Sequence, residues 1–373
     1  MCIMQQKTGV LQLIDSLNTG GAEVLSINIA NALASSEDYV SYLCATRKEG
    51  VLKANINEAV RYLFLNRKKT FDVKAILHLK SFVKKNNITI IHAHSTSILL
   101  AFVVKLFFLK VKIIWHDHYG KSEYLAQRET QILKIISFFV SSIISVNSSL
   151  RDWAQKELYC KNVFFINNFP FFSSANKITF LNGIKGKRII HIAAFREEKD
   201  HFNVIKSFHI LLQKENYNGW TLHLIGGKND KVYTQRVVDL IDSLNLKDVV
   251  FIYSACLDIS HVLEQASVGV LSSNSEGLPI ALLEYGLAKL PVVVTDVGEC
   301  ASIINNNNGY IVPPKNPFAF SEKLQILINS EEKRKKIGLA LHEKVNQHYS
   351  QQNFITQLLK IYRGEFDKEN YKQ

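Results

Sequence analysis

Two glutamates stand eight positions apart in the segment SSNSEGLPIALLEYG, residues 272–286. Two carboxylates in one active site can act as acid and base in the cleavage of a glycosidic bond. Eight residues along a helix correspond to a rise of about 12 Å, whereas the carboxylates of glycosidases lie about 5–9.5 Å apart. The spacing of Glu276 and Glu284 therefore favours contacts with two separate parts of an elongated ligand.

The residues around these glutamates predict a strand, a turn and a helix. VGVLSS (268–273) has the pattern of a buried strand, and Pro279 suits the first position of a helix. Gly277 allows a ligand close to the backbone, and a helix start offers N–H groups to a phosphate. We therefore expect Glu276 in the strand-to-helix loop and Glu284 about a turn and a half into the helix.

A second group of polar residues, REEKD (196–200), follows another apolar run. Arg196 and Lys199 could together bind a diphosphate, because a guanidinium pairs with phosphate in bidentate fashion. The alternative is a solvated turn before a helix.

Gly20 and Gly21 precede the first predicted helix in the string GGAE. The string is neither a dinucleotide-binding nor an ATP-binding glycine motif. A glycine pair before a helix can form a small anion-binding nest, although by itself it is only a tight turn.

Histidines gather at the ends of two predicted strands, in IHAHS (91–95) and WHDHYG (115–120). His116, Asp117 and His118 could ligate a metal, since residues two apart on a strand share a face. No third ligand follows at a recognisable spacing, so no metal site is predicted. His92 and His94 are interpreted as structural or cleft-lining residues.

Short apolar runs alternate with amphipathic helical stretches along the chain, which predicts parallel sheets covered by helices. The predicted helices include 22–35, 72–85 and 352–366. The predicted strands are 10–17, 40–46, 88–94, 111–117, 141–147, 188–195, 221–227, 249–254, 268–273 and 291–296.

The alternation pauses near residues 168–186, which divides the chain into two doubly wound Rossmann-like α/β domains facing a central cleft. The expected boundaries are 1–169 for the first domain, 170–186 for a linker and 187–350 for the second domain. Residues 351–373 are expected to form a C-terminal helix and tail that packs back on the first domain.

The formal net charge of +12 is concentrated in the first half, where residues 1–172 carry 21 Lys and Arg against 12 Asp and Glu. This excess indicates an anionic partner, such as a membrane surface, a nucleic acid or a phosphorylated acceptor, or simply a solubilising charge. Lys105, Lys110 and Lys112 interrupt a strongly apolar segment, and Arg67, Lys68 and Lys69 form a second cluster. Basic residues among apolar ones suit contact with anionic lipid, or a core helix with exposed lysines.

No apolar segment reaches the length of a transmembrane helix, and the N-terminus has no signal-peptide pattern. The five cysteines are scattered, as in proteins of a reducing compartment. The expected location is the cytoplasm, with peripheral attachment to the inner face of the cell membrane as a further expectation.

The string from Glu276 onward resembles the retaining nucleotide-sugar glycosyltransferases of family 4, which have the GT-B fold. The matching positions are Glu276–Pro279, Glu284, Pro291–Val293 and Gly309–Val312. The resemblance implies a retaining hexosyltransferase (EC 2.4) that moves a sugar from a nucleoside-diphosphate donor, expected to be UDP-linked, to an acceptor hydroxyl. Many relatives use lipid-linked glycans in polysaccharide or lipopolysaccharide assembly.

The resemblance also implies a role for each candidate residue. Glu276 would bind the donor sugar and Glu284 the ribose, while the backbone at Gly277 and Leu278 would contact the diphosphate. The same phosphates would be held by Gly20, Gly21, Arg196 and Lys199. The implied catalytic residues are His116, Glu276, Lys199 and Arg196, the acceptor-side candidates are His118 and Asp117, and no metal or other cofactor is expected.

The sequence departs from the family pattern at three places. Ala193 and Ala194 occupy the usual Gly-Arg positions, so Arg196 is the natural substitute. Lys289 and Glu299 replace usual glycines, and either could alter the shape of the sugar or phosphate pocket. The alternatives are another GT-B enzyme, such as a nucleotide-sugar epimerase or a sugar phosphorylase, and a basic nucleic-acid-binding protein. The epimerases lack the EGLP block, the phosphorylases need a longer chain, and no nucleic-acid-binding motif is present.

Overall fold

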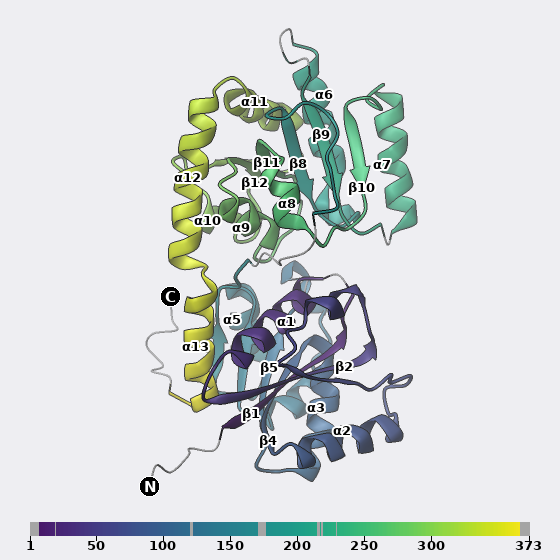
Figure 1. The fold of residues 1–373 in the computed structure, drawn as a ribbon, viewed down its shortest axis with the longest axis vertical. Coiled ribbons are helices and arrows are strands. Elements are labelled where there is room, and N and C mark those ends of the chain that lie inside the picture. Colours follow the sequence, from purple (N-terminus) through teal and green to yellow (C-terminus); the bar gives the residue numbers. More distant parts are fainter. Residues whose placement is uncertain are drawn as a thin grey trace. The chain divides into compact units, whose positions relative to one another are not determined.

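The computed structural model describes residues 7–365 except 19, 120–121, 171–176, 215–216, 218 and 229. The chain forms two compact units (Figure 1). The first unit comprises residues 1–168 and 352–373, and the second comprises residues 169–351. By this division the residues expected to form a linker, 170–186, fall within the second unit.

The first unit contains a seven-stranded parallel sheet with the order β3-β2-β1-β4-β5-β6-β7. Its strands are runs of buried aliphatic residues such as Leu11, Leu13, Ile91 and Ile113, as expected for a sheet covered on both faces. The strands are β1 (Thr8–Ser16), β2 (Tyr39–Lys48), β3 (Arg61–Phe64), β4 (Ile88–His94), β5 (Lys112–Asp117), β6 (Ser142–Ser145) and β7 (Val163–Phe165).

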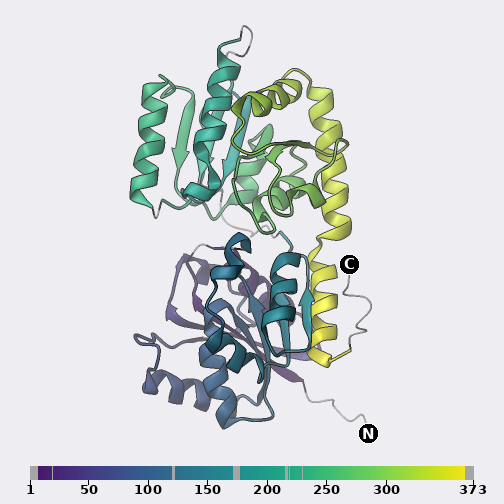
Figure 2. The ribbon, with the colours of Figure 1, turned by 180° about the vertical axis from the view of Figure 1, so that it is seen from behind.

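Helices lie on both faces of this sheet (Figures 1 and 2). Side-chain caps begin two of them, since Asp72 accepts from the backbone of Ala75 and Asn147 from that of Leu150. The helices are α1 (Gly21–Ala34), α2 (Val73–Lys85), α3 (Ile98–Phe107), α4 (Gln131–Ser137), α5 (Ser148–Glu157) and α13 (Gln351–Arg363), with 3₁₀ helices η1 (Val51–Asn55), η2 (Ser95–Ser97) and η3 (Ser122–Gln127).

The second unit has a six-stranded parallel sheet with the order β10-β9-β8-β11-β12-β13. The strands are β8 (Arg188–Ile192), β9 (Thr221–Ile225), β10 (Val250–Tyr253), β11 (Val268–Leu271), β12 (Val292–Thr295) and β13 (Tyr310–Val312). The helices are η4 (Glu197–Lys199), α6 (His201–Leu212), α7 (Lys231–Ser243), α8 (Ile259–Glu264), α9 (Ile280–Leu287), α10 (Cys300–Ile303), α11 (Pro317–Ile328) and α12 (Glu331–His348).

Each sheet has a point where the strand order reverses, between β1 and β4 in the first unit and between β8 and β11 in the second. Open α/β sheets bind ligands beyond the carboxyl ends of the strands at such a point. The fold therefore predicts that ligands contact the loops that follow β1, β4, β8 and β11.

The predicted α/β fold and the placement of the last helix are confirmed. Helix α13 packs on the first unit, where the hydroxyl of Tyr362 lies 2.7 Å from Nδ1 of His92. Residues 177–186, expected as part of a linker, instead pack on the second unit: the backbone N–H groups of Ile178 and Thr179 donate to Asp258. The short edge strands β3, β7 and β13 were not singled out from the sequence.

Candidate active site

Lys199 and Glu276 meet in the second unit, 77 residues apart in sequence. The ammonium of Lys199 donates to both carboxylate oxygens of Glu276, each at 2.7 Å. The hydroxyl of Ser273 donates to Oε1 of the same carboxylate at 2.6 Å. The side chain of Glu276 is only 7% exposed and that of Lys199 17%, so water screens this pair poorly.

Buried hydroxyls join the loops that carry this ion pair. Ser272 donates to the backbone carbonyls of Lys199 and Asp200, at 3.2 and 2.9 Å. Thr295, at the end of β12, donates to the carbonyl of Ser273 at 2.6 Å. The loops after β8, β11 and β12 are thus held together by these hydroxyls. Sequence analysis does not predict these contacts, because serine and threonine are common in all loops.

Gly298 allows a third loop to pack directly against the backbone of the EGLP segment. Its φ is +54°, and a Cβ atom at this position would lie 1.9 Å from the carbonyl oxygen of Glu276. The next residue, Glu299, donates its backbone N–H to the carbonyl of Gly277 at 3.1 Å. Glu299, which stands where the family usually has glycine, therefore supports the loop through its backbone.

We expect Gly298→Ala to lower both stability and activity, because the new methyl group must displace the backbone that carries Glu276. The positive φ alone costs an alanine about 1–2 kcal/mol, and the contact adds to that cost. Gly186→Ala is the matched control, since Gly186 has φ +88° but open space around its Cβ position. Thermal unfolding should show the larger loss for Gly298→Ala, and equal losses would contradict the contact.

Helix α9 begins at Ile280, so Pro279 is the N-cap residue and not the first helical residue as predicted. Gly277 and Leu278 form the turn into the helix, with Leu278 packed against the core of the second unit. Glu284 lies in the second turn of α9, as expected. Its residue is only partly exposed, and desolvation raises the pKa of its carboxyl to about 8.

Arg196 follows the end of β8 and is exposed. Its backbone is extended, and its carbonyl accepts from the N–H of Lys199 at 3.0 Å. Ala193 and Ala194 pack at the end of the strand, where Gly226 approaches the carbonyl of Ala193 too closely to carry a Cβ atom. The structure thus brings Lys199 and Glu276 together and leaves the guanidinium of Arg196 in solvent.

The first unit holds four stacked histidines at the ends of β4 and β5, namely His92, His94, His116 and His118. The rings of His92 and His116 are 5.3 Å apart and within 5° of parallel, and those of His116 and His118 are 4.3 Å apart. Burial lowers the pKa of His92 and His118 to about 3, and it lowers the pKa of the other two rings well below the usual value. All four rings are therefore neutral at pH 7.

The stack brings together ligand atoms that the sequence spacing did not connect. Nitrogens of His92, His94 and His116 lie within 4.8 Å of one another. The rings are nearly parallel, however, and the lone pairs of parallel imidazoles do not point at a common centre. Nδ1 of His94 and Nε2 of His118 are 3.1 Å apart and share a hydrogen bond. The arrangement is that of a packed polar cluster.

His116 is 1% exposed, between the other rings and Phe354 of α13. This burial argues against its direct contact with a sugar, whereas His118 is partly exposed beyond the end of β5. Asp117 is also buried, and both of its oxygens accept from Arg128, at 2.6 and 3.0 Å. Asp117 is thus engaged in an internal ion pair instead of lining an acceptor surface.

Gly20 and Gly21 lie at the start of α1, after the loop that follows β1. A Cβ atom on Gly20 would meet the carboxylate of Glu23 at 2.3 Å, while Gly21 has open space around its Cβ position. Burial raises the pKa of Glu23 above the usual value. The glycine pair therefore offers exposed backbone at the carboxyl edge of the first sheet.

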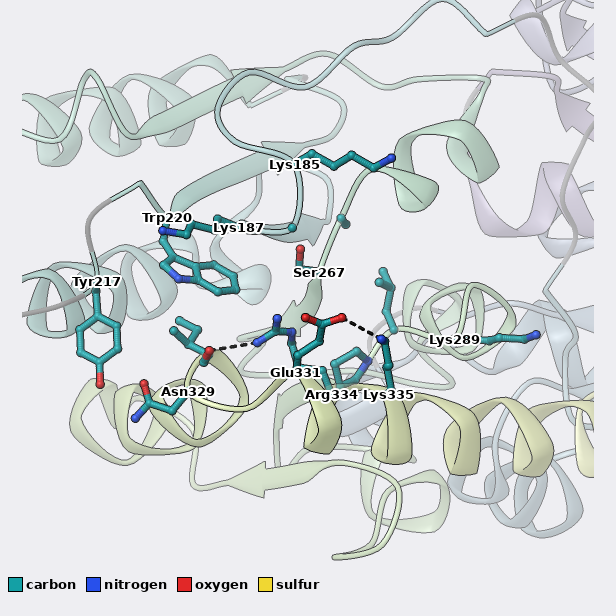
Figure 3. A pocket seen from close by; sticks show the side chains of 15 residues that line it. Lys185, Lys187, Tyr217, Trp220, Ser267, Lys289, Asn329, Glu331, Arg334 and Lys335 are labelled. Carbon is teal, nitrogen blue, oxygen red and sulfur yellow. Dashed lines mark hydrogen bonds and ion pairs between the residues drawn. The ribbon is translucent and has the colours of Figure 1, made fainter.

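A separate hollow of about 650 Å³ lies at the amino ends of β8, β11 and β12 (Figure 3). Lys185, Lys187, Lys289 and Arg334 line it, and Lys289 has a positive φ of 59°. The loop of Glu276 follows the opposite end of β11. Lys289, one of the two residues that could alter the sugar or phosphate pocket, therefore borders this other hollow.

The chain matches two family models. Residues 175–341 match the family described as glycosyl transferases group 1, and residues 19–169 match glycosyltransferase family 4. An uncharacterized glycosyltransferase of Haemophilus influenzae is 24% identical over 323 residues, which cover 84% of this chain and 88% of that protein. An N-acetylgalactosaminyltransferase of Campylobacter jejuni that acts on an undecaprenol-linked glycan is 24% identical, with 87% and 90% covered.

Solved structures share the fold at lower sequence identity. HepE of Anabaena, solved in complex with UDP and glucose, superposes with a TM-score of 0.77 at 15% identity, covering 96% of this chain and 100% of that one. A glycosyltransferase from Rickettsia africae superposes with a TM-score of 0.76 at 17% identity, covering 97% and 99%.

Proposed function

Because the chain belongs to the family 4 glycosyltransferases and has their GT-B fold, we propose that it is a retaining hexosyltransferase with a UDP-sugar donor. Its acceptor is a hydroxyl of a lipid-linked glycan in cell-surface polysaccharide or lipopolysaccharide assembly. The observation that carries the proposal is the contact between Lys199 and Glu276 beyond the carboxyl ends of β8 and β11.

Each side chain of this site has a distinct part. Lys199, helped by the exposed Arg196, offsets the charge that develops on the departing diphosphate. Glu276 accepts hydrogen bonds from hydroxyls of the donor sugar, and Ser273 and Lys199 fix its orientation. Since Glu276 is already engaged by two donors, it serves as a binding group, and attack comes from the acceptor on the same face that the diphosphate leaves.

The remaining candidates complete the donor site. The backbone at Gly277 and Leu278, and that at Gly20 and Gly21, offers N–H groups to the phosphates. Glu284 accepts from the ribose. In the first unit, we assign contact with the sugar to His118 in place of His116, because His118 is the more exposed of the two.

Relatives support the donor and acceptor classes. HepE was solved with UDP-glucose, and the relatives of this chain include a protein of amylovoran biosynthesis in Erwinia amylovora. The protein from Campylobacter jejuni acts on an undecaprenol-linked glycan. We expect transfer without a metal, so that addition of EDTA leaves the rate unchanged.

A thermal-shift screen tests the donor. A ligand present at about 100 times its Kd stabilises the folded state by about 2.7 kcal/mol, so UDP-glucose, UDP-N-acetylglucosamine or UDP-N-acetylgalactosamine should raise Tm. Stabilisation by GDP-mannose alone would show that the donor carries guanine and not uracil as its base. A chain that no nucleotide sugar stabilises would contradict the proposed function.

The affinity for the UDP-sugar should rise with pH. Ribose hydroxyls donate to the ionised form of Glu284, but a pKa of about 8 keeps this carboxyl protonated in the free protein at pH 7. Binding must then release a proton, so affinity should increase by up to about tenfold per pH unit below pH 8 and level off above it.

Calorimetry with the stabilising UDP-sugar between pH 6 and 9 measures this dependence, because its esterified diphosphate has no ionisation in that range. Glu284→Gln should bind more weakly at pH 9 and lose the pH dependence. A wild-type affinity that stays constant from pH 6 to 8 would contradict contact of Glu284 with the ribose.

A lipid-linked acceptor also determines where the enzyme must act, because such an acceptor is held in a membrane. Among the residues that the structure describes, no helix is both long and apolar enough to cross a bilayer. We propose that the protein acts from the cytoplasm and meets its acceptor at the inner face of the membrane through the basic first unit.

A further inference from the structure

Three helices of the first unit expose large apolar side chains to solvent. Phe138 is 74% exposed and Leu109 is 73% exposed, although both are of types that are usually buried. We call the set the apolar face; it consists of Val73 and Leu77 of α2, Leu106, Phe107 and Leu109 of α3 and the turn after it, and Ile132, Ile135 and Phe138 of α4 and its end.

The members of the apolar face adjoin one another. Val73, Leu77 and Lys80 follow the spacing of one stripe along α2, and the ammonium of Lys80 lies 4.2 Å from the ring centre of Phe107. Figures 1 and 2 both show α2 and α3 side by side. Phe102 of α3 contacts Phe139, which in turn contacts Phe138. The three helices therefore present a continuous surface.

The turn after α3 exposes Leu109 and is closed by hydrogen bonds. The ammonium of Lys105 donates to the carbonyls of Leu109 and Val111, each at 2.6 Å, which holds the turn closed. The ammonium of Lys105 is thus engaged within the turn, whereas Lys110 is exposed. Arg67 is buried, 2.9 Å from Asp15, so only the lysines of its cluster reach the surface.

The chain around α2 and α3 of the apolar face is strongly basic. Residues 67–112 contain ten lysines and arginines, and Asp72 is their single acidic residue. Asp72 caps α2 through its side chain. Among the cations, Lys68, Lys69, Lys74, Lys84 and Lys110 are exposed.

We propose that the apolar face, with its surrounding lysines, docks on an anionic phospholipid membrane and inserts its aromatic and aliphatic side chains among the lipid headgroups. Lysines attract the anionic headgroups, and burial of the apolar side chains then holds the protein at the interface. A second copy of the chain fits poorly, since a twofold contact would bring the exposed lysines of this region against their own copies. The inference rests on the proposed function, because only a lipid-linked acceptor gives membrane docking a purpose.

Sedimentation of the full chain with vesicles tests the proposal. The protein should bind vesicles of phosphatidylglycerol and phosphatidylcholine, bind vesicles of phosphatidylcholine alone far more weakly, and lose binding as salt is raised. The double substitution L109S/F138S should reduce binding at least about tenfold, since it removes two large apolar side chains from the interface. Phe318→Ser is the matched control, because Phe318 is 70% exposed on α11 of the second unit, and it should bind like the wild type.

Three outcomes would overturn the docking surface: no binding to anionic vesicles, equal binding by L109S/F138S, or a dimer in solution that this variant dissociates. The last result would assign the apolar face to a protein contact. The UDP-sugar thermal shift on the same samples separates the two proposals. If UDP-sugar stabilises the protein but the protein does not bind vesicles, the proposed function stands and the docking surface is wrong. If the protein binds vesicles but no UDP-sugar stabilises it, the proposed function is contradicted.

Discussion

Lys199→Ala should reduce sugar transfer by about a hundredfold to a thousandfold, the loss that follows removal of one charge-stabilising group from an active site. The ammonium is the single cation held beside Glu276 in the described contacts, at 2.7 Å, and it would neutralise the departing diphosphate. The loss should fall mainly on kcat, because the charge on the leaving group grows in the transition state.

Glu276→Gln should lose activity to a similar extent. The amide keeps the size of the side chain but cannot hold Lys199 as an ion pair, and it accepts sugar hydroxyls less strongly than a carboxylate. Both variants should keep the circular dichroism of the wild type.

Lys185→Ala is the matched control, since Lys185 is an exposed lysine of the same unit that lines the other hollow. It should turn over normally. Normal turnover by Lys199→Ala, measured as release of the nucleoside diphosphate, would show that Lys199 does not stabilise the departing diphosphate.

The first unit should unfold in mild acid. Its four stacked histidines have folded-state pKa values far below 6.5, the usual value of a histidine in an unfolded chain. Below pH 6.5 the unfolded chain therefore binds more protons than the folded one, and stability that is present above that pH is lost as the pH falls.

His92 and His118, whose pKa is about 3 in the folded state, each cost about 2 kcal/mol at pH 5, because the linkage is about 1.4 kcal/mol per pH unit. Together they cost about 4 kcal/mol, a large part of the stability of a domain, about 5–15 kcal/mol, and the lowered pKa values of His94 and His116 act in the same direction. Hydrogen exchange of the β4 and β5 peptides between pH 7 and pH 5 should report loss of protection.

Two histidine variants sharpen this measurement. His116→Phe removes one buried ring whose Nδ1 has no partner among the described atoms and keeps the stacking on Phe354, so it should shift the transition to lower pH. His78→Ala, at an exposed position of α2, should leave the transition in place. Protection that stays constant down to pH 5 would contradict the burial of the stack.

Most strands of both sheets were predicted from the sequence, because their apolar runs are stable only when they are buried. It also predicted that Glu276 lies in a strand-to-helix loop and Glu284 in the helix that follows, because glycine and proline mark the turn between them. The loop positions follow directly from the strand that precedes them.

The histidine stack could not be predicted from spacing, because it depends on strand register. His94 pairs with His116 across β4 and β5, and Tyr362 reaches His92 from a helix 270 residues away. The burial of Arg67 depends in the same way on Asp15 at the end of β1. Lys289 precedes β12 (Val292–Thr295), so it borders the amino end of this strand, whereas the loop of Glu276 follows the carboxyl end of β11.

Helix α13 also sets an order of assembly. The first unit needs α13 to cover its histidines, yet the second unit lies between α13 and the rest of the first unit in the chain. A nascent chain therefore cannot complete its first unit until the second has been synthesised, although domains commonly fold one after another from the N-terminus. For the same reason, a chimera that exchanges the acceptor half between two such enzymes must take α13 from the same parent as residues 1–168.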